Sequence, residues 1–118
     1  MKKKIINVIG LGYIGLPTAA ILANNGFKVF GTDINKKNID IINSGKSHIL
    51  EPELDEYVGK AILSGNLKVS IKPEKSDIYI ICVPTPFISD YKFPKPDISY
   101  ILKATKSISK LLKPNDLI

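Results

Sequence analysis

Hydrophobic and polar positions follow two patterns along this chain of 118 residues. Short, almost continuous apolar runs predict buried strands at 4–9, 28–32, 67–70 and 78–83. Between and after these runs, apolar residues recur at helical spacing, which predicts helices over 14–25, 35–45, 52–65 and 97–112. Strands that alternate with helices in this way predict an α/β fold with a parallel sheet and crossover helices.

Residue types near the predicted helix ends support these boundaries. Asn35 and Asp97 are expected to cap the second and fourth helices, because a short polar side chain can accept a hydrogen bond from the first turn. Pro52 is expected to open the third helix, and Pro17 fits the first turn of the first.

The run at 78–83, "IYIICV", is apolar throughout. Strands buried on both faces have this composition, which is typical of a doubly wound, Rossmann-type parallel sheet. The last residues, "KPNDLI" at 113–118, are similar to "KPEKSDIYII" at 72–81. In the earlier segment, a turn leads into the strand at 78–83. We therefore expect a further strand to begin near the end of the chain. Residues 1–118 would then be a fragment with an exposed sheet edge, on which a homo-oligomer could pair.

Composition narrows the functional classes. The chain is 44% hydrophobic and 24% charged, as expected for one globular domain. Its single cysteine, Cys82, rules out an internal disulfide and fits a reducing compartment. All 17 basic residues are lysines spread along the chain, which argues for a solvated surface and against a nucleic-acid partner despite a net charge of +6. No apolar run approaches the roughly 20 residues that a membrane span needs.

The clearest candidate chemistry lies in "VIGLGYIGLPTAA" at 8–20. Gly10, Gly12 and Gly15 form a G-x-G-x-x-G motif between a predicted strand and a predicted helix, the context of a dinucleotide site. The first glycine would allow a tight turn, the second a close approach of the pyrophosphate, and the third close packing of helix on strand. The backbone N–H groups near Tyr13 and Ile14 would face the phosphates at the positive end of the helix.

Asp33 is the second sequence feature that indicates a dinucleotide-binding site. It follows the second predicted strand, 18 residues after Gly15. A carboxylate there can accept hydrogen bonds from the adenosine ribose hydroxyls and would repel a 2′-phosphate, so NAD is the expected cofactor. Lys36 and Lys37 lie close by and weaken the expected preference against NADP.

The loop "VPTPF" at 83–87 follows the fourth predicted strand. Carboxyl ends of strands line the ligand crevice of a doubly wound sheet, so Thr85 is a candidate cofactor contact. A rigid connection without a ligand role is the alternative for this loop.

Other reactive side chains point to no further site. Cys82 lies within an apolar run and is expected to be a buried, inert thiol. His48 has no serine and acid partners at a useful spacing, and no cysteine–histidine cluster suggests a metal. Tyr91 and Phe93 are expected to make packing or partner contacts. The sequence therefore assigns no catalytic residue and no metal ligand within the chain.

Five segments together resemble the UDP-glucose/GDP-mannose dehydrogenase family, and most closely its UDP-N-acetylmannosamine dehydrogenase branch. They are "VIGLGYIGLPTAA", "DIN" at 33–35, "INSGKSHILEPEL" at 42–54, "VPTPF" and "KPDISYILKATKSIS" at 95–109. The glycine motif is shared with many families, whereas "HILEPEL" and the combination of "VPTP" with "PDISYI" are far more specific.

The resemblance implies a cytoplasmic, NAD-dependent enzyme of nucleotide-sugar metabolism that serves polysaccharide synthesis. It implies oxidation of the C6 hydroxyl of a UDP-sugar to a carboxylate, with two NAD reduced in succession. The family's cofactor contacts map onto Tyr13, Ile14, Asp33 and Thr85, besides the glycines. Its nucleophilic cysteine, catalytic lysine and UDP-sugar-binding domains would lie beyond residue 118, so the chain alone is expected to be inactive.

Two alternatives remain at this stage. A stand-alone nucleotide-sensing domain, as in the regulatory parts of channels and transporters, shares the strand–glycine–helix–acid unit but would not need "HILEPEL" or "VPTPF". Another dehydrogenase, such as a 6-phosphogluconate-like or 3-hydroxyisobutyrate-like enzyme, fits the glycine loop but fits the proline–threonine–proline loop poorly.

Overall fold

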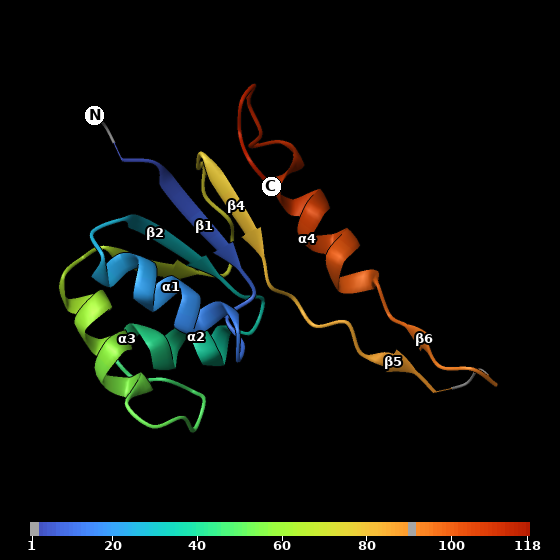
Figure 1. Ribbon diagram of the computed structural model, residues 1–118, viewed down its shortest axis with the longest axis horizontal. Helices are drawn as coiled ribbons and strands as arrows, with labels where there is room; N and C mark the ends of the chain where they lie inside the picture. Colours follow the sequence, from blue (N-terminus) through green and yellow to red (C-terminus); the bar gives the residue numbers. More distant parts are fainter. Residues whose placement is uncertain (1–2, 90–91) are drawn as a thin grey trace.

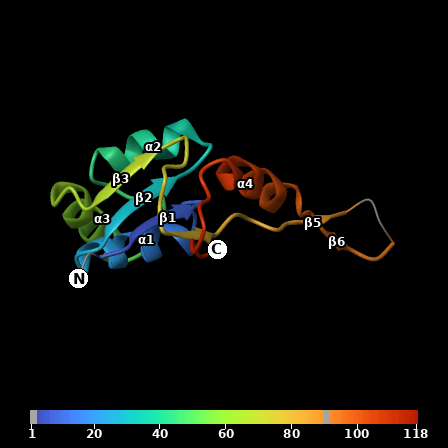
Figure 2. The ribbon, with the colours of Figure 1, turned by 90° about the horizontal axis from the view of Figure 1, so that it is seen from above.

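The computed structural model describes residues 3–89 and 92–118 and has a four-stranded parallel sheet at its centre. The strand order is β3-β2-β1-β4, with β2, β1 and β4 labelled in Figure 1 and β3 in Figure 2. The strands are β1 (Ile5–Ile9), β2 (Lys28–Thr32), β3 (Leu67–Ser70) and β4 (Ile78–Ile81). The helices are α1 (Gly15–Asn24), α2 (Lys36–Asn43), α3 (Leu54–Leu63) and α4 (Ser99–Ser109). The predicted α/β, Rossmann-type doubly wound sheet is confirmed.

Two hydrophobic clusters, one on each face of the sheet, explain the apolar run of β4. Ile78 and Ile80 pack against the larger cluster, which includes residues of α1, α2 and α3. Tyr79 and Ile81 belong to the smaller cluster, which α4 covers with Ala104 and Ile108. Successive side chains of a strand point to opposite faces, so a strand covered on both sides has no polar alternation. Of the four residues of β4, only Tyr79 is fully buried.

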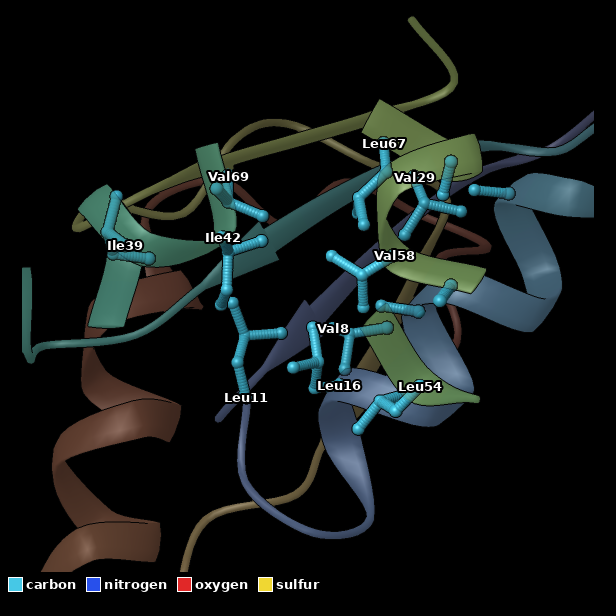
Figure 3. Close-up of a cluster of buried hydrophobic side chains, with 14 of the residues drawn as sticks. Val8, Leu11, Leu16, Val29, Ile39, Ile42, Leu54, Val58, Leu67 and Val69 are labelled. Atoms are coloured by element: carbon cyan, nitrogen blue, oxygen red, sulfur yellow. The ribbon is translucent and has the colours of Figure 1, made fainter. Parts of the chain in front are cut away.

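The larger cluster forms the main core between the sheet and three helices (Figure 3). Its labelled members are Val8, Leu11, Leu16, Val29, Ile39, Ile42, Leu54, Val58, Leu67 and Val69. Leu11 is fully buried although it lies within the glycine motif. The same core therefore holds the sheet together and anchors the loop that follows β1.

Of the four residues predicted at helix starts, two are confirmed and two are shifted, and Pro17 lies in the first turn of α1 as expected. The Asn35 side chain caps α2 by accepting a hydrogen bond from the Asn38 backbone N–H at 3.2 Å. Asp97 is not the N-cap of α4, because the helix begins at Ser99; its carboxylate nevertheless accepts the Ser99 N–H at 2.9 Å. Pro52 does not open α3, since Glu53 adopts a left-handed conformation, with φ +67°, before the helix begins at Leu54.

The "VPTPF" loop at 83–87 leads into a short antiparallel hairpin that the sequence patterns did not predict. Its strands are β5 (Phe87–Ile88) and β6 (Lys95–Pro96), and they extend away from the main body (Figure 2). Phe93 is 77% exposed, so it is not a core residue, and a contact with a partner, the other expectation for it, stays a prediction. Tyr91, the other aromatic residue of that prediction, lies outside the described residues.

Near the position where a further strand was expected, the chain forms one isolated β-bridge beside β4. Leu117 forms a parallel bridge with Ile78, and its carbonyl accepts the Tyr79 N–H at 2.8 Å. Its own N–H donates to the Asp77 carbonyl at 3.0 Å. This contact is a single bridge beside the four-stranded sheet, and the further strand itself stays a prediction. Among residues 3–89 and 92–118, no helix has the length and apolar character needed to cross a membrane.

Candidate dinucleotide-binding site

All seven predicted site residues lie at the end of the sheet where the parallel strands have their carboxyl termini, here called the carboxyl edge. The glycine motif follows β1, Asp33 follows β2, and Thr85 follows β4. These strands are parallel, so their carboxyl ends meet at the same edge. The chain runs from β1 outward through β2 to β3 and then returns to β4 on the other side of β1. Ligand crevices of doubly wound sheets lie at such a reversal of strand order.

The glycine loop needs its first and third glycines for internal reasons. Gly10 has φ +95°, and a Cβ there would lie 2.7 Å from the Cys82 carbonyl oxygen. A Cβ at Gly15 would lie 1.7 Å from the carbonyl oxygen of Gly10. The start of α1 therefore rests directly on the turn after β1, which in turn rests on the backbone that follows β4.

Gly12 differs from these two glycines. A Cβ added to it would have no heavy atom of the described residues within 4 Å. Internal packing therefore does not require glycine here. The backbone at Gly12 is open to solvent, which leaves room for an incoming ligand to approach the loop closely.

The first turn of α1 has the features of an anion-binding helix start. Its N-cap residue, Ile14, makes no side-chain hydrogen bond to the turn, and the first turn contains no acidic residue. Tyr13 and Ile14 are each 71% exposed at this end. The helix dipole and the free N–H groups of a first turn attract phosphate.

Asp33 joins two segments of the site through its carboxylate. Oδ2 accepts a hydrogen bond from the Leu11 N–H at 2.9 Å, and Oδ1 accepts one from the Asn35 N–H at 2.9 Å. Each carboxylate oxygen can accept a further hydrogen bond, so capacity remains for two ribose hydroxyls. Nearby Lys36 pairs with Asp40 along α2 at 3.2 Å, so its ammonium group has a carboxylate partner other than Asp33.

The segment after β4 contributes one exposed and one partly buried side chain. Thr85 is exposed, so its hydroxyl is accessible at the carboxyl edge. Cys82 lies beneath the glycine loop, where its Cβ would be 3.2 Å from a Cβ at Gly15. Burial raises the pKa of the Cys82 thiol, which disfavours the reactive thiolate.

Asn7 is a buried polar residue that the sequence-based prediction missed. Its side-chain amide donates to the Phe30 carbonyl at 2.9 Å and to Thr32 Oγ1 at 3.0 Å, and its Oδ1 accepts the Glu74 N–H at 2.9 Å. These bonds tie β1 to the end of β2 and to the segment before β4. The only sequence feature that could have indicated this role is the single amide side chain within the apolar strand "IINVI".

His48 and the acidic residues give no metal site. Among the described residues, no group of three or more histidine, cysteine, aspartate or glutamate side chains could hold a metal ion. Nδ1 of His48 is buried and has no hydrogen-bond partner among residues 3–89 and 92–118. His48 lies in "HILEPEL", whose residues Glu51 and Pro52 approach Tyr13 across a groove of about 330 Å³.

Known proteins resemble this chain over nearly its whole length. Residues 4–118 match the NAD-binding domain of the UDP-glucose/GDP-mannose dehydrogenase family. A UDP-N-acetyl-D-mannosamine dehydrogenase from Campylobacter jejuni is 52% identical over 94% of this chain and 27% of its own length. An NDP-N-acetyl-D-galactosaminuronic acid dehydrogenase from Ralstonia nicotianae is 47% identical over 96% of this chain and 26% of its own. The chain thus spans about a quarter of the length of these relatives.

Solved structures agree with the sequence comparisons. The UDP-N-acetyl-mannosamine dehydrogenase of Staphylococcus aureus superposes with a TM-score of 0.91 and 44% identity, over 96% of this chain and 27% of that one. A GDP-mannose dehydrogenase from Pseudomonas, solved as a ternary complex, superposes with a TM-score of 0.81 and 32% identity, over 92% of this chain and 25% of that one. These matches favour neither a channel-type sensing domain nor a 6-phosphogluconate-like enzyme. The chain belongs to the UDP-glucose/GDP-mannose dehydrogenase family and is an NAD-binding domain of that family.

Proposed function

We propose that this chain forms the cofactor-binding part of an enzyme that oxidises UDP-N-acetylmannosamine at C6. The observation that carries this proposal is its 52% identity, over 94% of its length, to a UDP-N-acetyl-D-mannosamine dehydrogenase. The glycine loop, Asp33 and Thr85 at one edge of the sheet support it, because an NAD-dependent oxidation needs such a site.

The proposed reaction converts a primary alcohol to a carboxylate. Each of two steps transfers one hydride to NAD, and one water molecule supplies the second carboxylate oxygen. The balance is RCH2OH + 2 NAD⁺ + H2O → RCOO⁻ + 2 NADH + 3 H⁺. When bound, NAD serves as the hydride acceptor in both steps.

This chain's residues would bind and orient the cofactor. The open backbone at Gly12 and the N–H groups of Tyr13 and Ile14 would bind the pyrophosphate. Asp33 would accept hydrogen bonds from the adenosine ribose, and the Thr85 hydroxyl would contact the cofactor on the β4 side. Gly10 and Gly15 would serve by allowing the loop and helix to adopt this arrangement.

The chemistry would depend on residues outside 1–118. The relatives are about four times as long, which leaves ample chain for sugar-nucleotide-binding domains and a nucleophilic cysteine. Cys82 is a poor candidate for that nucleophile, because it lies beneath the glycine loop with a raised pKa. We infer that the chain alone binds NAD without turning over a substrate.

A second candidate substrate is an NDP-N-acetylgalactosamine sugar. The relative named NDP-N-acetyl-D-galactosaminuronic acid dehydrogenase is 47% identical over 96% of the chain, close to the value for the first candidate. The part of the protein that would discriminate between the two sugars lies outside these 118 residues in this proposal.

The setting of the enzyme is also proposed. A single cysteine and a nucleotide-sugar substrate fit a cytoplasmic enzyme, whose uronate product would serve polysaccharide synthesis. The edge of the sheet beside β4 and the exposed hairpin leave surface for a homo-oligomer.

Purified full-length protein tests the proposal by NADH absorbance with a panel of nucleotide sugars. We expect two NADH per UDP-N-acetylmannosamine and slower reaction with UDP-glucose. A higher kcat/KM for the galactosamine sugar would favour the second candidate. No NADH formation with any sugar nucleotide, from a folded protein that binds NAD, would contradict the proposed reaction.

A further inference from the structure

Asn7 is fully buried within β1, between apolar residues of the same strand. Its side-chain nitrogen donates to the Phe30 carbonyl at 2.9 Å and to Thr32 Oγ1 at 3.0 Å, and its oxygen accepts the Glu74 N–H at 2.9 Å. A buried amide costs free energy unless hydrogen bonds replace its contacts with water, so an apolar residue would satisfy the packing of this strand more simply. A buried network whose polar groups have partners favours a single arrangement of the segments that it joins.

The network stabilises the end of β2. Thr32 is 4% exposed, and its hydroxyl accepts the Asn7 amide and donates to the Lys72 carbonyl over a longer distance of 3.5 Å. Lys72 and Glu74 belong to residues 71–77, which connect β3 to β4 without a helix. The last residue of β2 is therefore bonded both to β1 and to this connection.

The end of β2 in turn binds the glycine loop. The Thr32 carbonyl accepts the Gly10 N–H at 2.7 Å, and the next residue, Asp33, accepts the Leu11 N–H through Oδ2 at 2.9 Å. The Asp33 N–H donates to the Ser70 carbonyl at 3.2 Å. Two successive N–H groups of the loop are thus bound by two successive residues of β2 and its end. The position of Asp33 relative to the loop depends on where Thr32 lies.

This spacing matters for the cofactor, and the step rests on the proposed function. That function assigns the pyrophosphate to the glycine loop and the adenosine ribose to Asp33. Both groups belong to one NAD molecule, so the distance between their two subsites must match the ligand. A hydrogen bond weakens once its donor and acceptor leave the range of about 2.7–3.2 Å. A displaced Asp33 carboxylate would also lie differently toward a 2′-phosphate and repel it less effectively.

We propose that Asn7 and Thr32 are positioning residues that set the spacing between the glycine loop and Asp33, and with it the preference for NAD over NADP. Both are buried, so neither would touch the cofactor. Thr32 would act on Gly10 through its carbonyl and on Asp33 through the adjoining backbone. Asn7 would act through the Thr32 hydroxyl and through the connection that contains Glu74.

Isothermal titration of the full-length protein with NAD and with NADP tests this assignment. Thr32→Val removes the hydroxyl and keeps nearly the same side-chain shape. We expect it to weaken NAD binding by about three- to tenfold and to narrow the preference over NADP by about threefold or more. Thr32→Ser keeps the hydroxyl and should restore both values to within about twofold of the natural sequence. Asn7→Leu should change both in the same direction as Thr32→Val.

Leu67→Ala is the control for a loss of stability alone. Leu67 is 1% exposed at the first residue of β3, at the end of the sheet opposite the carboxyl edge. This variant should have a lower thermal midpoint but an unchanged ratio of the Kd values for NAD and NADP. Circular dichroism at the titration temperature shows that each variant is folded. The milder Thr32→Val decides the outcome if Asn7→Leu does not fold.

Three results would overturn the proposal. An unchanged Kd ratio in folded Thr32→Val would show that the hydroxyl does not position the site. An equal change in Thr32→Ser would assign the effect to packing and not to the hydrogen bond. An equal change in Leu67→Ala would assign it to general destabilisation. The titrations need no sugar nucleotide and no turnover, so failure of the proposed reaction in the NADH assay is a separate outcome.

Discussion

The Asp33 carboxylate accepts a hydrogen bond from the Leu11 backbone N–H, with 2.9 Å between Oδ2 and the nitrogen. This contact joins the end of β2 to the glycine loop after β1. Asp33 therefore has a structural task within the protein besides the proposed contact with ribose. A substitution that removes the charge and a substitution that removes the acceptor should have different effects.

Asp33→Ala should weaken NAD binding by about 10- to 100-fold and narrow the preference for NAD over NADP, since two ribose hydrogen bonds and a repulsive charge are lost. Isothermal titration with both cofactors measures this. Asp33→Asn is the matched control, because its side-chain oxygen can still accept the Leu11 N–H. It loses the second contact, from the Asn35 N–H to the other carboxylate oxygen, so the loop should be more stable than in Asp33→Ala while much of the selectivity is lost. Unchanged NAD affinity and selectivity in Asp33→Ala would argue against the ribose contact.

Substitutions of different glycines in the motif should affect either protein stability or cofactor binding. Gly12→Val should leave the thermal midpoint nearly unchanged, because a Cβ there meets no heavy atom of the described residues, but it should block the approach of the pyrophosphate. NADH fluorescence on titration measures binding, and circular dichroism measures folding. Normal NADH binding by a folded Gly12→Val protein would contradict the proposed cradle.

Gly15→Ala is the contrasting variant. Its Cβ would lie 1.7 Å from the Gly10 carbonyl oxygen, so the protein should be strongly destabilised before any ligand is added. A stable Gly15→Ala variant would show that the start of α1 can move away from the turn.

Much of this fold was predictable because local signals and tertiary packing agree. The run "IYIICV" predicted a strand covered on both faces, and Asn35 predicted the cap of α2. The hairpin of β5 and β6 was missed because its four strand residues include a proline and show no alternation. The start of α3 was misplaced since nothing in the sequence indicates a left-handed Glu53.

The site was predictable in its residue types but not in its internal contacts. The spacing of Asp33 after the glycine motif predicted that it lies near the glycine loop. Its hydrogen bond to the Leu11 N–H could not be predicted in this way, because it depends on the pairing of β1 with β2. Asn7 was missed because one amide in an apolar strand has no periodic signal. Its three partners come from segments far apart in the sequence.

Asn7→Leu should reduce the free energy of unfolding by about 2–4 kcal/mol, because it removes the three hydrogen bonds of a buried amide and leaves their backbone and hydroxyl partners unsatisfied. Urea denaturation measures this change. Thr32→Val is a suitable comparison, since it removes only one of the three bonds. A loss no larger than that of Thr32→Val would show that the Phe30 and Glu74 contacts contribute little.

Stability should also fall at acidic pH through Asp77. Hydrogen bonds from the Ile5 backbone N–H and the Lys113 ammonium lower the pKa of this carboxyl below its usual value. A carboxyl whose folded-state pKa is lowered stabilises the protein above its unfolded pKa of about 4, and this contribution disappears as pH falls through the folded-state value.

Asp77→Asn should therefore be less stable than the natural sequence at neutral pH, and its stability should fall less steeply below about pH 4. The Ile5 N–H keeps an acceptor in this variant, while the Lys113 ammonium keeps its partner Asp116. Asp40→Asn is the control, because Asp40 pairs with Lys36 on the exposed surface of α2. Urea denaturation over a pH series compares the two variants. Parallel pH profiles for Asp77→Asn and the natural sequence would show that this carboxyl does not carry the acid-dependent loss.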